Sequence, residues 1–565
     1  MASSVLAAAR LAAVVVAASP VFAAAAHGDP SDPDAPSAAV RWLLDASGSP
    51  QPLCATEEGR ALWAAVRAFY EGRSDRPAWT DGPRLLPAGE RLRAALGAAA
   101  DEGLDPSRYD PRRVVGAAPR ILEASLDEQA AARAAAAWEV GLTVAMARYA
   151  TDLARGQVDP SHVSVLWRSR PRPFDVRSAL QEAADSGRPE TVLEEARPVH
   201  PQYAALREAL RVFAGRAARE PQIPLVPAGP ALRPGARSPR VRVLRARLAF
   251  WGDLAAPAAD QPGDVLDRAT VEALKRFEAS HGLPSDGILD PDAVAALNVP
   301  AAERARQIGL NLERWRWQER TGRGRSIVVN IPTFELHAYE DGREALAMRV
   351  ISGRPETPTP VFAQDMTAVV FSPYWNVPAN ISADETLPAV LRDRAYLQRM
   401  NLEVLRGDEV VDPRRVDWRH EAHLVSFRQR PGAGNSLGLV KFLLPNPFNV
   451  YLHDTPTAAL FERPRRAFSH GCVRLAKPEA LARWVLGGLG GWTPARIAAA
   501  MRAGRESSVP LPQPIPVSIS YFTVWVDGDG TVEFRPDVYR HDAAQEPLLA
   551  PARPDAGTSS VAAAG

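Results

Sequence analysis

The sequence predicts a multidomain protein made of an α-helical scaffold, a compact three-helix unit and a mostly β domain that carries an insertion. Three observations predict this division. The 565 residues exceed what one hydrophobic core usually supports. The spacing of apolar residues changes from helical to strand-like near residue 323. A proline-rich stretch separates the two helical parts, as linkers commonly do.

Charge and the first residues narrow the class of protein. Lys and Arg total 67 against 66 for Asp and Glu, so no global field favours nucleic acid or an acidic membrane surface. At residues 1–26, Arg10 precedes a short apolar run and then small residues, the order typical of a secretory signal peptide. We expect export, with an uncleaved anchor as the alternative. No later stretch of about 20 apolar residues appears.

The first half of the chain is predicted to be helical. Residues 27–220 are rich in Ala, Leu, Arg and Glu, with apolar residues at helical spacing, for example at 137–149. Several prolines divide this region, which favours short helices around one core over a long coiled coil. Residues 221–239 contain enough proline to predict an extended linker.

Residues 240–300 are predicted to form three short helices, with Phe277 on the buried face of the second. Four groups of residues here resemble the signature of the peptidoglycan-binding domain: Leu244-Arg245, Phe277, His281-Gly282-Leu283 and Asp286-Gly287. These residues also suit core and turn positions, so they indicate a module and assign no binding residue. The family commonly has glycine where this sequence has Asp290, which leaves the geometry of that turn open.

The remaining segments follow from alternation and composition. Residues 301–322 are expected to form a helical connector, and residues 323–542 a mostly β domain whose last hairpin turns at 527–530. Polar sequence at 383–422 predicts an insertion that covers a cleft. The Ala-, Pro- and Gly-rich residues 543–565 predict a disordered tail.

The densest cluster of reactive side chains lies late in the chain. Cys472, His453 and His470 fall within 20 residues of one another, and an imidazole can deprotonate a thiol that then attacks a carbonyl. Gly471 permits a sharp turn, and the N–H groups of Gly471 and Cys472 are candidates for binding an oxyanion. The three side chains are also acceptable zinc ligands, so a metal site is the alternative. The other cysteine, Cys54, is expected to be structural.

This cluster resembles the active-site motif of the L,D-transpeptidase (YkuD-like) family, with its upstream His and its Ser-His-Gly-Cys-x-Arg core at residues 469–474. The resemblance extends over about 200 residues from Ser326 and, with the preceding modules, matches the order of the large Gram-negative members. It implies a β-sandwich-like fold, with Cys472 as nucleophile and His453 as general base and acid. The implied active-site loop comprises Ser469, His470, Gly471 and Arg474. Weaker substrate-binding candidates are Tyr451, Asn435 and Asp454. The backbone carbonyl of Asp454 would also orient the imidazole of His453.

The resemblance also implies a function. Cys472 would form a thioester with a tetrapeptide stem of peptidoglycan and release D-alanine, and an amine would then accept the acyl group, forming 3→3 cross-links. Water or a protein lysine as acceptor would make the enzyme a carboxypeptidase or an anchoring transferase. We expect a periplasmic location, with peptidoglycan stems and glycan strands as binding partners and carbapenems as acylating inhibitors. We expect no cofactor and no nucleic-acid partner. The oligomeric state is left open. A non-catalytic wall-binding scaffold and a metal-dependent peptidase remain the alternatives.

Overall fold

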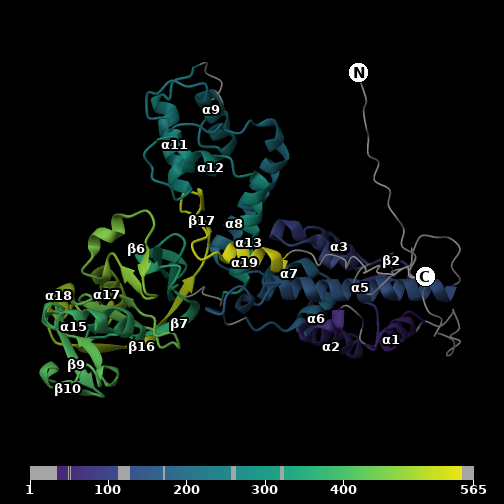
Figure 1. Cartoon of the computed structure of the whole chain (residues 1–565). Coiled ribbons are helices and arrows are strands. Elements are labelled where there is room, and N and C mark those ends of the chain that lie inside the picture. Colours follow the sequence, from purple (N-terminus) through teal and green to yellow (C-terminus); the bar gives the residue numbers. More distant parts are fainter. Residues whose placement is uncertain are drawn as a thin grey trace, which may run out of the picture.

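The computed structural model describes residues 35–48, 50, 53–111, 128–169, 172–255, 263–318 and 324–549 (Figure 1). The predicted signal peptide at 1–26 and residues 550–565 of the predicted tail lie outside these ranges. Within them, no helix has the length and apolar character needed to cross a membrane.

The N-terminal region is helical, as predicted, but its central helix is long. Helix α5 (Glu128–Arg155) has 28 residues, and its buried side chains lie on several sides of the helix because shorter helices surround it. Buried Glu139 on α5 accepts hydrogen bonds from the Ala78 and Trp79 N–H groups and from the Tyr70 and Thr80 hydroxyls, which replace the water it has lost. The surrounding helices are α1 (Ala35–Ser47), α2 (Glu57–Gly72), α3 (Pro87–Gly97), α6 (Val176–Ser186), α7 (Pro189–Ala196) and α8 (Pro201–Arg219), with a two-residue hairpin of β1 (Thr80–Asp81) and β2 (Arg84–Leu85).

The three-helix unit comprises α9 (Arg240–Trp251), α11 (Arg268–Ser280) and α12 (Pro291–Leu297), and Leu244 and Phe277 are fully buried in its core. Asp290 is the N-cap of α12: its carboxylate accepts a hydrogen bond from the Ala293 N–H at 2.8 Å, and its φ of −90° requires no glycine. The predicted linker at 221–239 does not run free of this unit, because residues within it form β-bridges to Leu289 and Val265.

A connecting helix, α13 (Ala301–Arg316), joins this unit to the C-terminal domain and packs against α8. Arg316 at its end is fully buried, 2.8 Å from the Glu313 carboxylate, and donates to the Tyr203 hydroxyl and to the Glu102 backbone carbonyl of the scaffold. Both charges of this pair belong to α13, and the hydrogen bonds of Arg316 to Tyr203 and Glu102 join the end of the helix to the scaffold.

The C-terminal domain contains a ten-stranded, mostly antiparallel sheet whose ends approach each other. Strand β12 pairs with both β13 and β7, so the sheet closes around one apolar core. Scaffold residues Trp167–Arg168 add strand β3 beside β7, and the buried Trp167 ring belongs to the core of the sheet. The other strands of this sheet are β4 (Arg325–Asn330), β5 (Glu335–Glu340), β6 (Arg343–Gly353), β7 (Val361–Phe371), β12 (Val440–Leu443), β13 (Leu452–His453), β14 (Ala467–Ser469), β15 (Val473–Leu475) and β16 (Ser507–Ser520), and helices α17 (Pro478–Leu486) and α18 (Pro494–Met501) pack on it.

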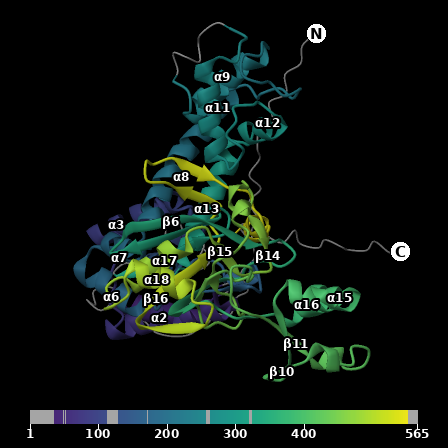
Figure 2. The same ribbon diagram turned by 90° about the vertical axis from the view of Figure 1, so that its left-hand side faces the viewer.

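The predicted insertion at 383–422 is wider in the structure. Strand β8 (Trp375–Asn376) pairs with β11 (Ser426–Gln429), and β9 (Leu402–Arg406) and β10 (Glu409–Val411) complete a four-stranded sheet with its own apolar core. Figure 2 shows this unit set apart from the main sheet. Its helices are α14 (Ala379–Ile381), α15 (Leu387–Arg392) and α16 (Ala395–Arg399), with a π-helical turn at Ser382–Thr386.

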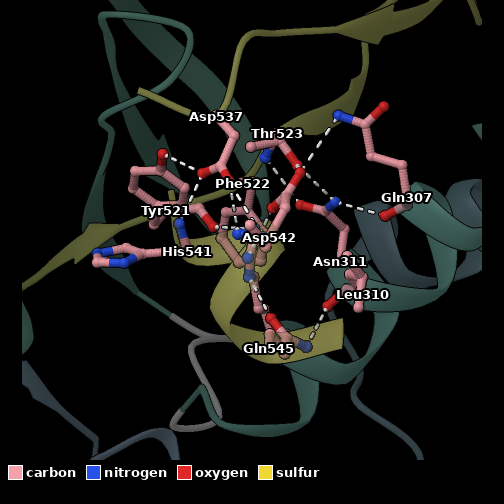
Figure 3. Close-up of polar contacts among 12 residues, drawn as sticks. Gln307, Leu310, Asn311, Tyr521, Phe522, Thr523, Asp537, His541, Asp542 and Gln545 are labelled. Atoms are coloured by element: carbon pink, nitrogen blue, oxygen red, sulfur yellow. Dashed lines mark hydrogen bonds and ion pairs between the residues drawn. The ribbon is translucent and has the colours of Figure 1, made fainter. Parts of the chain in front are cut away.

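The end of the described chain is folded. The predicted hairpin is formed by β17 (Val524–Val526) and β18 (Val532–Phe534). The prediction of disorder from residue 543 is wrong as far as Leu549, because α19 (His541–Leu549) docks on α13. Figure 3 shows the contacts: the Asp537 carboxylate accepts from the His541 and Asp542 N–H groups at the start of α19, and Gln545 donates to the Leu310 carbonyl. These buried polar partners outweigh the Ala- and Pro-rich composition.

Candidate active site

The pairing of β13 with β15 brings the predicted reactive residues together. The two strands are parallel, with Leu452 opposite Val473 and His453 opposite Arg474. Leu452 and Val473 point into the apolar core. Because side chains alternate along a strand, the flanking residues lie on the opposite face. That face carries Tyr451, His453, Cys472 and Arg474.

His453 is held as a neutral imidazole. Its Nδ1–H donates to the backbone carbonyl oxygen of Asp454 at 2.6 Å, which leaves Nε2 as the nitrogen able to accept a proton. Burial and, to a smaller extent, the positive charge of Arg474 lower the pKa of His453 to about 3. The ring is therefore an oriented base at neutral pH.

Cys472 is a free, half-buried thiol at the end of the active-site turn. Its Sγ lies 3.8 Å from the backbone oxygen of Asn449, to which it donates. Burial raises the pKa of Cys472, whereas hydrogen bonds from Tyr451 and the charge of Arg474 act in the opposite direction. The thiol is thus protonated at rest, with two neighbours that favour the thiolate.

Ser469 fixes the turn that presents the thiol. Its Oγ donates to the Cys472 carbonyl at 2.5 Å and accepts from the Gly471 N–H at 3.1 Å. Gly471 has a φ of +117°, a conformation that favours glycine. The Gly471 N–H is engaged by Ser469 in this structure, and its predicted role in binding an oxyanion stays a prediction. Among the described residues no acceptor occupies the Cys472 N–H, so that group is available.

A neighbouring segment clamps this turn from outside. The Arg354 N–H donates to the Ser469 carbonyl at 3.0 Å, and the Thr359 hydroxyl donates to the Gly471 carbonyl at 2.8 Å. Tyr539, just before α19, donates from its hydroxyl to the Gly353 carbonyl at 2.6 Å. The C-terminal segment therefore supports the active-site turn through one intermediate layer.

His470 faces the insertion. Its Nε2 lies 2.7 Å from Oε1 of Glu385, in the π-helical turn of the insertion, and 2.7 Å from Nη2 of Arg354. One nitrogen cannot donate to the carboxylate and accept from the guanidinium at the same time, so its tautomer or charge decides between these partners. The active-site loop and the insertion meet at this side chain.

Three family models match consecutive parts of the chain. They are a scaffold domain at residues 64–210, a "Putative peptidoglycan binding domain" at 237–297 and an L,D-transpeptidase catalytic domain at 324–505. The chain contains an L,D-transpeptidase catalytic domain. A peptidoglycan-binding domain and a helical region precede it.

A curated relative carries the same assignment in its name. A "Putative L,D-transpeptidase" from Haemophilus influenzae (strain ATCC 51907 / DSM 11121 / KW20 / Rd) is 37% identical over 218 residues, which cover 38% of this chain and 44% of that protein. The chain thus aligns with less than half the length of this relative.

Solved structures give more distant matches. An L,D-transpeptidase (residues 123–326) from Xylanimonas cellulosilytica DSM 15894 is 17% identical, with 52% of this chain and 98% of that chain covered and a TM-score of 0.17. An L,D-transpeptidase (Yku) from Stackebrandtia nassauensis is 14% identical, with 52% and 96% covered and a TM-score of 0.20.

Two predicted substrate-binding residues of the L,D-transpeptidase domain have other roles. Asn435 is buried, and its side-chain amide donates to the Pro373 and Arg430 carbonyls. The Asp454 carboxylate accepts from the Leu439 N–H at 2.8 Å and from its neighbour Thr455 at 2.7 Å. Both side chains organise loops around the site, whereas Tyr451 lies beside the thiol.

Arg474 contributes its charge to the site more than its hydrogen bonds. Burial lowers its pKa, and its Nη1 donates only a long bond of 3.4 Å to the Thr457 hydroxyl. Its proximity to both Cys472 and His453 appears in the pKa of each. A cation here favours a thiolate and a neutral imidazole together.

The sequence reasoning missed Asn449 and Thr359. Asn449 has a φ of +54°, which asparagine tolerates better than most residues, and this turn directs its carbonyl toward the thiol. No composition signal identifies a backbone carbonyl or a supporting hydroxyl.

Within the described ranges, His, Cys, Asp and Glu do not gather in groups of three that could hold a metal ion. Cys54 is a free thiol buried in the scaffold core.

Proposed function

We propose that the protein is a peptidoglycan L,D-transpeptidase that uses Cys472 as its nucleophile. His453 Nε2 takes the thiol proton as Sγ attacks the carbonyl of the third stem residue, which we take to be diaminopimelate. The bond from this carbonyl to the D-alanine nitrogen breaks, the imidazolium returns the proton to the leaving amine, and a thioester remains. An acceptor amine then attacks the thioester, and the thiol leaves with the proton returned through His453.

One observation carries this proposal: Cys472 and a neutral, oriented His453 share a face of paired strands. The Asp454 carbonyl occupies Nδ1 of His453, so the base is fixed before substrate arrives. The Cys472 N–H has no acceptor among the described residues and supports a role in stabilising the oxyanion. Loss of one such donor typically costs about 2.7 to 4 kcal/mol of barrier.

The proposed acceptor is the side-chain amine of a second stem, which gives a 3→3 cross-link. The contact between Glu385 and His470 ties the insertion to the active-site loop, an arrangement that favours exclusion of water from the thioester. Water as acceptor would give a carboxypeptidase, and a protein lysine would give an anchoring transferase. We further propose that the protein works in the periplasm and that carbapenems acylate Cys472.

Turnover of a defined substrate tests the proposal. Purified protein is incubated with disaccharide tetrapeptide, and D-alanine and cross-linked dimer are followed by mass spectrometry. We expect Cys472→Ala to abolish D-alanine release and the matched control Cys54→Ala, far from the site in the scaffold core, to retain it. Full turnover by Cys472→Ala would refute the nucleophile.

The same assay separates the alternatives. Loss of turnover with a chelator would favour a metal-dependent peptidase, and release of tripeptide without dimer would favour a carboxypeptidase. Binding without turnover in both the unmodified protein and Cys54→Ala would favour a non-catalytic scaffold.

A further inference from the structure

A hollow lies away from Cys472, where three parts of the chain meet. This cavity of about 460 Å³ is enclosed by α8 of the scaffold, by the ends of α9 and α11 of the peptidoglycan-binding domain, and by the β17–β18 hairpin. Both views show α8 and the hairpin beside that domain (Figures 1 and 2). Its volume lies in the range of ligand sites of about 300 to 1,000 Å³.

The cavity has an apolar wall and charged residues of both signs. Phe213 and Phe534 line it with ring centroids 5.2 Å apart, and the partly exposed Val212 lies beside them. Arg216 and Asp253 supply one charge of each sign, and the exposed Glu208, which also lines the cavity, pairs with Arg211. Most ligand sites combine apolar surface with a few polar groups placed in this way.

Arg216 is placed by packing. Its guanidinium lies over the Phe213 ring, 4.9 Å from the centroid. A side chain at Gly252 would begin 3.1 Å from Nη2 of Arg216, so glycine at this left-handed helix end leaves the guanidinium its room. Asp253 is the next residue and follows the C-terminus of α9, where a helix attracts cations.

The two charges attract each other without direct contact. Among the described residues, no hydrogen bond or ion pair within 4 Å involves the Asp253 carboxylate or the Arg216 guanidinium, although each favours the charged form of the other and Arg276 also attracts Asp253. Burial raises the pKa of Asp253 to about 6 and lowers the pKa of Arg216, as expected for charges that have lost water. Half-buried charges without a direct ion-pair contact are costly, and a ligand with complementary charges placed between them would relieve that cost.

We infer that this cavity binds the α-amino-acid zwitterion at the free end of a diaminopimelate side chain in a peptidoglycan stem. Asp253 receives its ammonium, Arg216 receives its carboxylate, and the apolar wall contacts the methylene groups between that end and the peptide. The inference rests on the proposed function only for the identity of the substrate. It gives the chain a wall contact separate from the catalytic site, formed jointly by three regions.

Equilibrium binding of a soluble disaccharide tetrapeptide tests the inference. The full chain carries Cys472→Ala so that no thioester forms, and calorimetry counts the sites. We expect two sites, with one lost in Arg216→Met and in Asp253→Asn. The matched control is Arg242→Met on α9, whose exposed side chain pairs with Asp264 outside the cavity, and it should keep both sites.

Modified ligands identify the recognised group. Acetylation of the diaminopimelate amine should weaken the cavity site at least tenfold, and Asp253→Asn should remove this sensitivity. Equal numbers of binding sites in Arg216→Met and Arg242→Met would overturn the inference. Undiminished binding of the acetylated stem to the cavity would also overturn it. So would binding of the glycan without its peptide to the cavity as tightly as the complete disaccharide tetrapeptide.

Two controls keep the inference separate from folding and from catalysis. Near-ultraviolet circular dichroism and melting temperatures should match between Arg216→Met, Asp253→Asn and the parent. In chains with Cys472 intact, the control Arg242→Met should release D-alanine from soluble substrate at the parent kcat. An inert Cys472 would refute the proposed reaction while leaving the cavity measurement valid.

Discussion

Burial lowers the pKa of His453 and raises the pKa of Cys472. It disfavours the imidazolium of His453 and the thiolate of Cys472, so both groups are neutral at pH 7. Proton transfer therefore accompanies attack in this account, and the neighbours of the thiol determine how readily it occurs. Arg474 and Tyr451 are the two that favour the charged sulfur.

Tyr451→Phe tests this electrostatic balance. Its hydrogen bond lowers the pKa of Cys472, so its removal should move the pH midpoint of thiol alkylation by iodoacetamide to higher pH. Rates are measured from pH 6 to 11 in a Cys54→Ala background. Tyr374→Phe, whose ring contacts Arg428 of the insertion, should leave the midpoint unchanged. A midpoint that does not move in Tyr451→Phe would contradict the assigned contact.

The sequence identifies the reactive side chains but does not predict the residues and backbone groups that position them. Cys472 and His453 stand out because few residue types perform acyl transfer and the two are close in sequence. The Gly471 N–H, predicted to bind an oxyanion, donates in this structure to Ser469 Oγ, only two residues away. Such local capture depends on backbone geometry that residue types do not reveal.

Among the elements, α19 shows how buried polar partners order an unpromising segment. Arg314 of α13 is fully buried, and its Nη2 lies 2.7 Å from the Asp542 carboxylate of α19. Its Nε donates to Gln545 at 2.8 Å. The composition of residues 543–549 predicted disorder because composition does not show that α19 pairs with buried Arg314 of α13.

Asp542→Ala should therefore destabilise the protein strongly. It leaves the buried Arg314 charge without its carboxylate, a change that costs about 3 to 5 kcal/mol. Glu546→Ala, on the same helix but in an exposed pair with Arg306, should cost about 0 to 1 kcal/mol. Urea denaturation followed by tryptophan fluorescence compares the two, and equal losses would contradict the docking of α19.

For the whole molecule, the catalytic sheet includes a strand from the scaffold. Trp167 precedes the matched catalytic domain by more than 150 residues, yet its ring lies in the core of that domain, 5.1 Å from Trp317. A two-residue strand has no periodicity to detect, so the sequence predicted separate domains and missed this link. The longer strands and the hairpin were predictable because their alternation reports which face is buried.

Trp167→Ala should destabilise the catalytic domain by about 3 to 5 kcal/mol, the usual cost of removing a buried tryptophan. Hydrogen exchange of the β7 amides measures the effect locally. Trp138→Ala, which packs on the scaffold core, should increase exchange in α5 and leave β7 protected. Unchanged protection of β7 in Trp167→Ala would show that the catalytic domain does not depend on this strand.

We propose that Cys472 carries the acyl group during catalysis. Intact-protein mass spectrometry after rapid mixing with disaccharide tetrapeptide and acid quenching detects such an acyl-enzyme. We expect a mass increase equal to the substrate minus D-alanine, located on the peptide that contains Cys472 and absent from Cys472→Ala. Release of D-alanine with the adduct on another residue, or with Cys472→Ala fully active, would refute this role of Cys472.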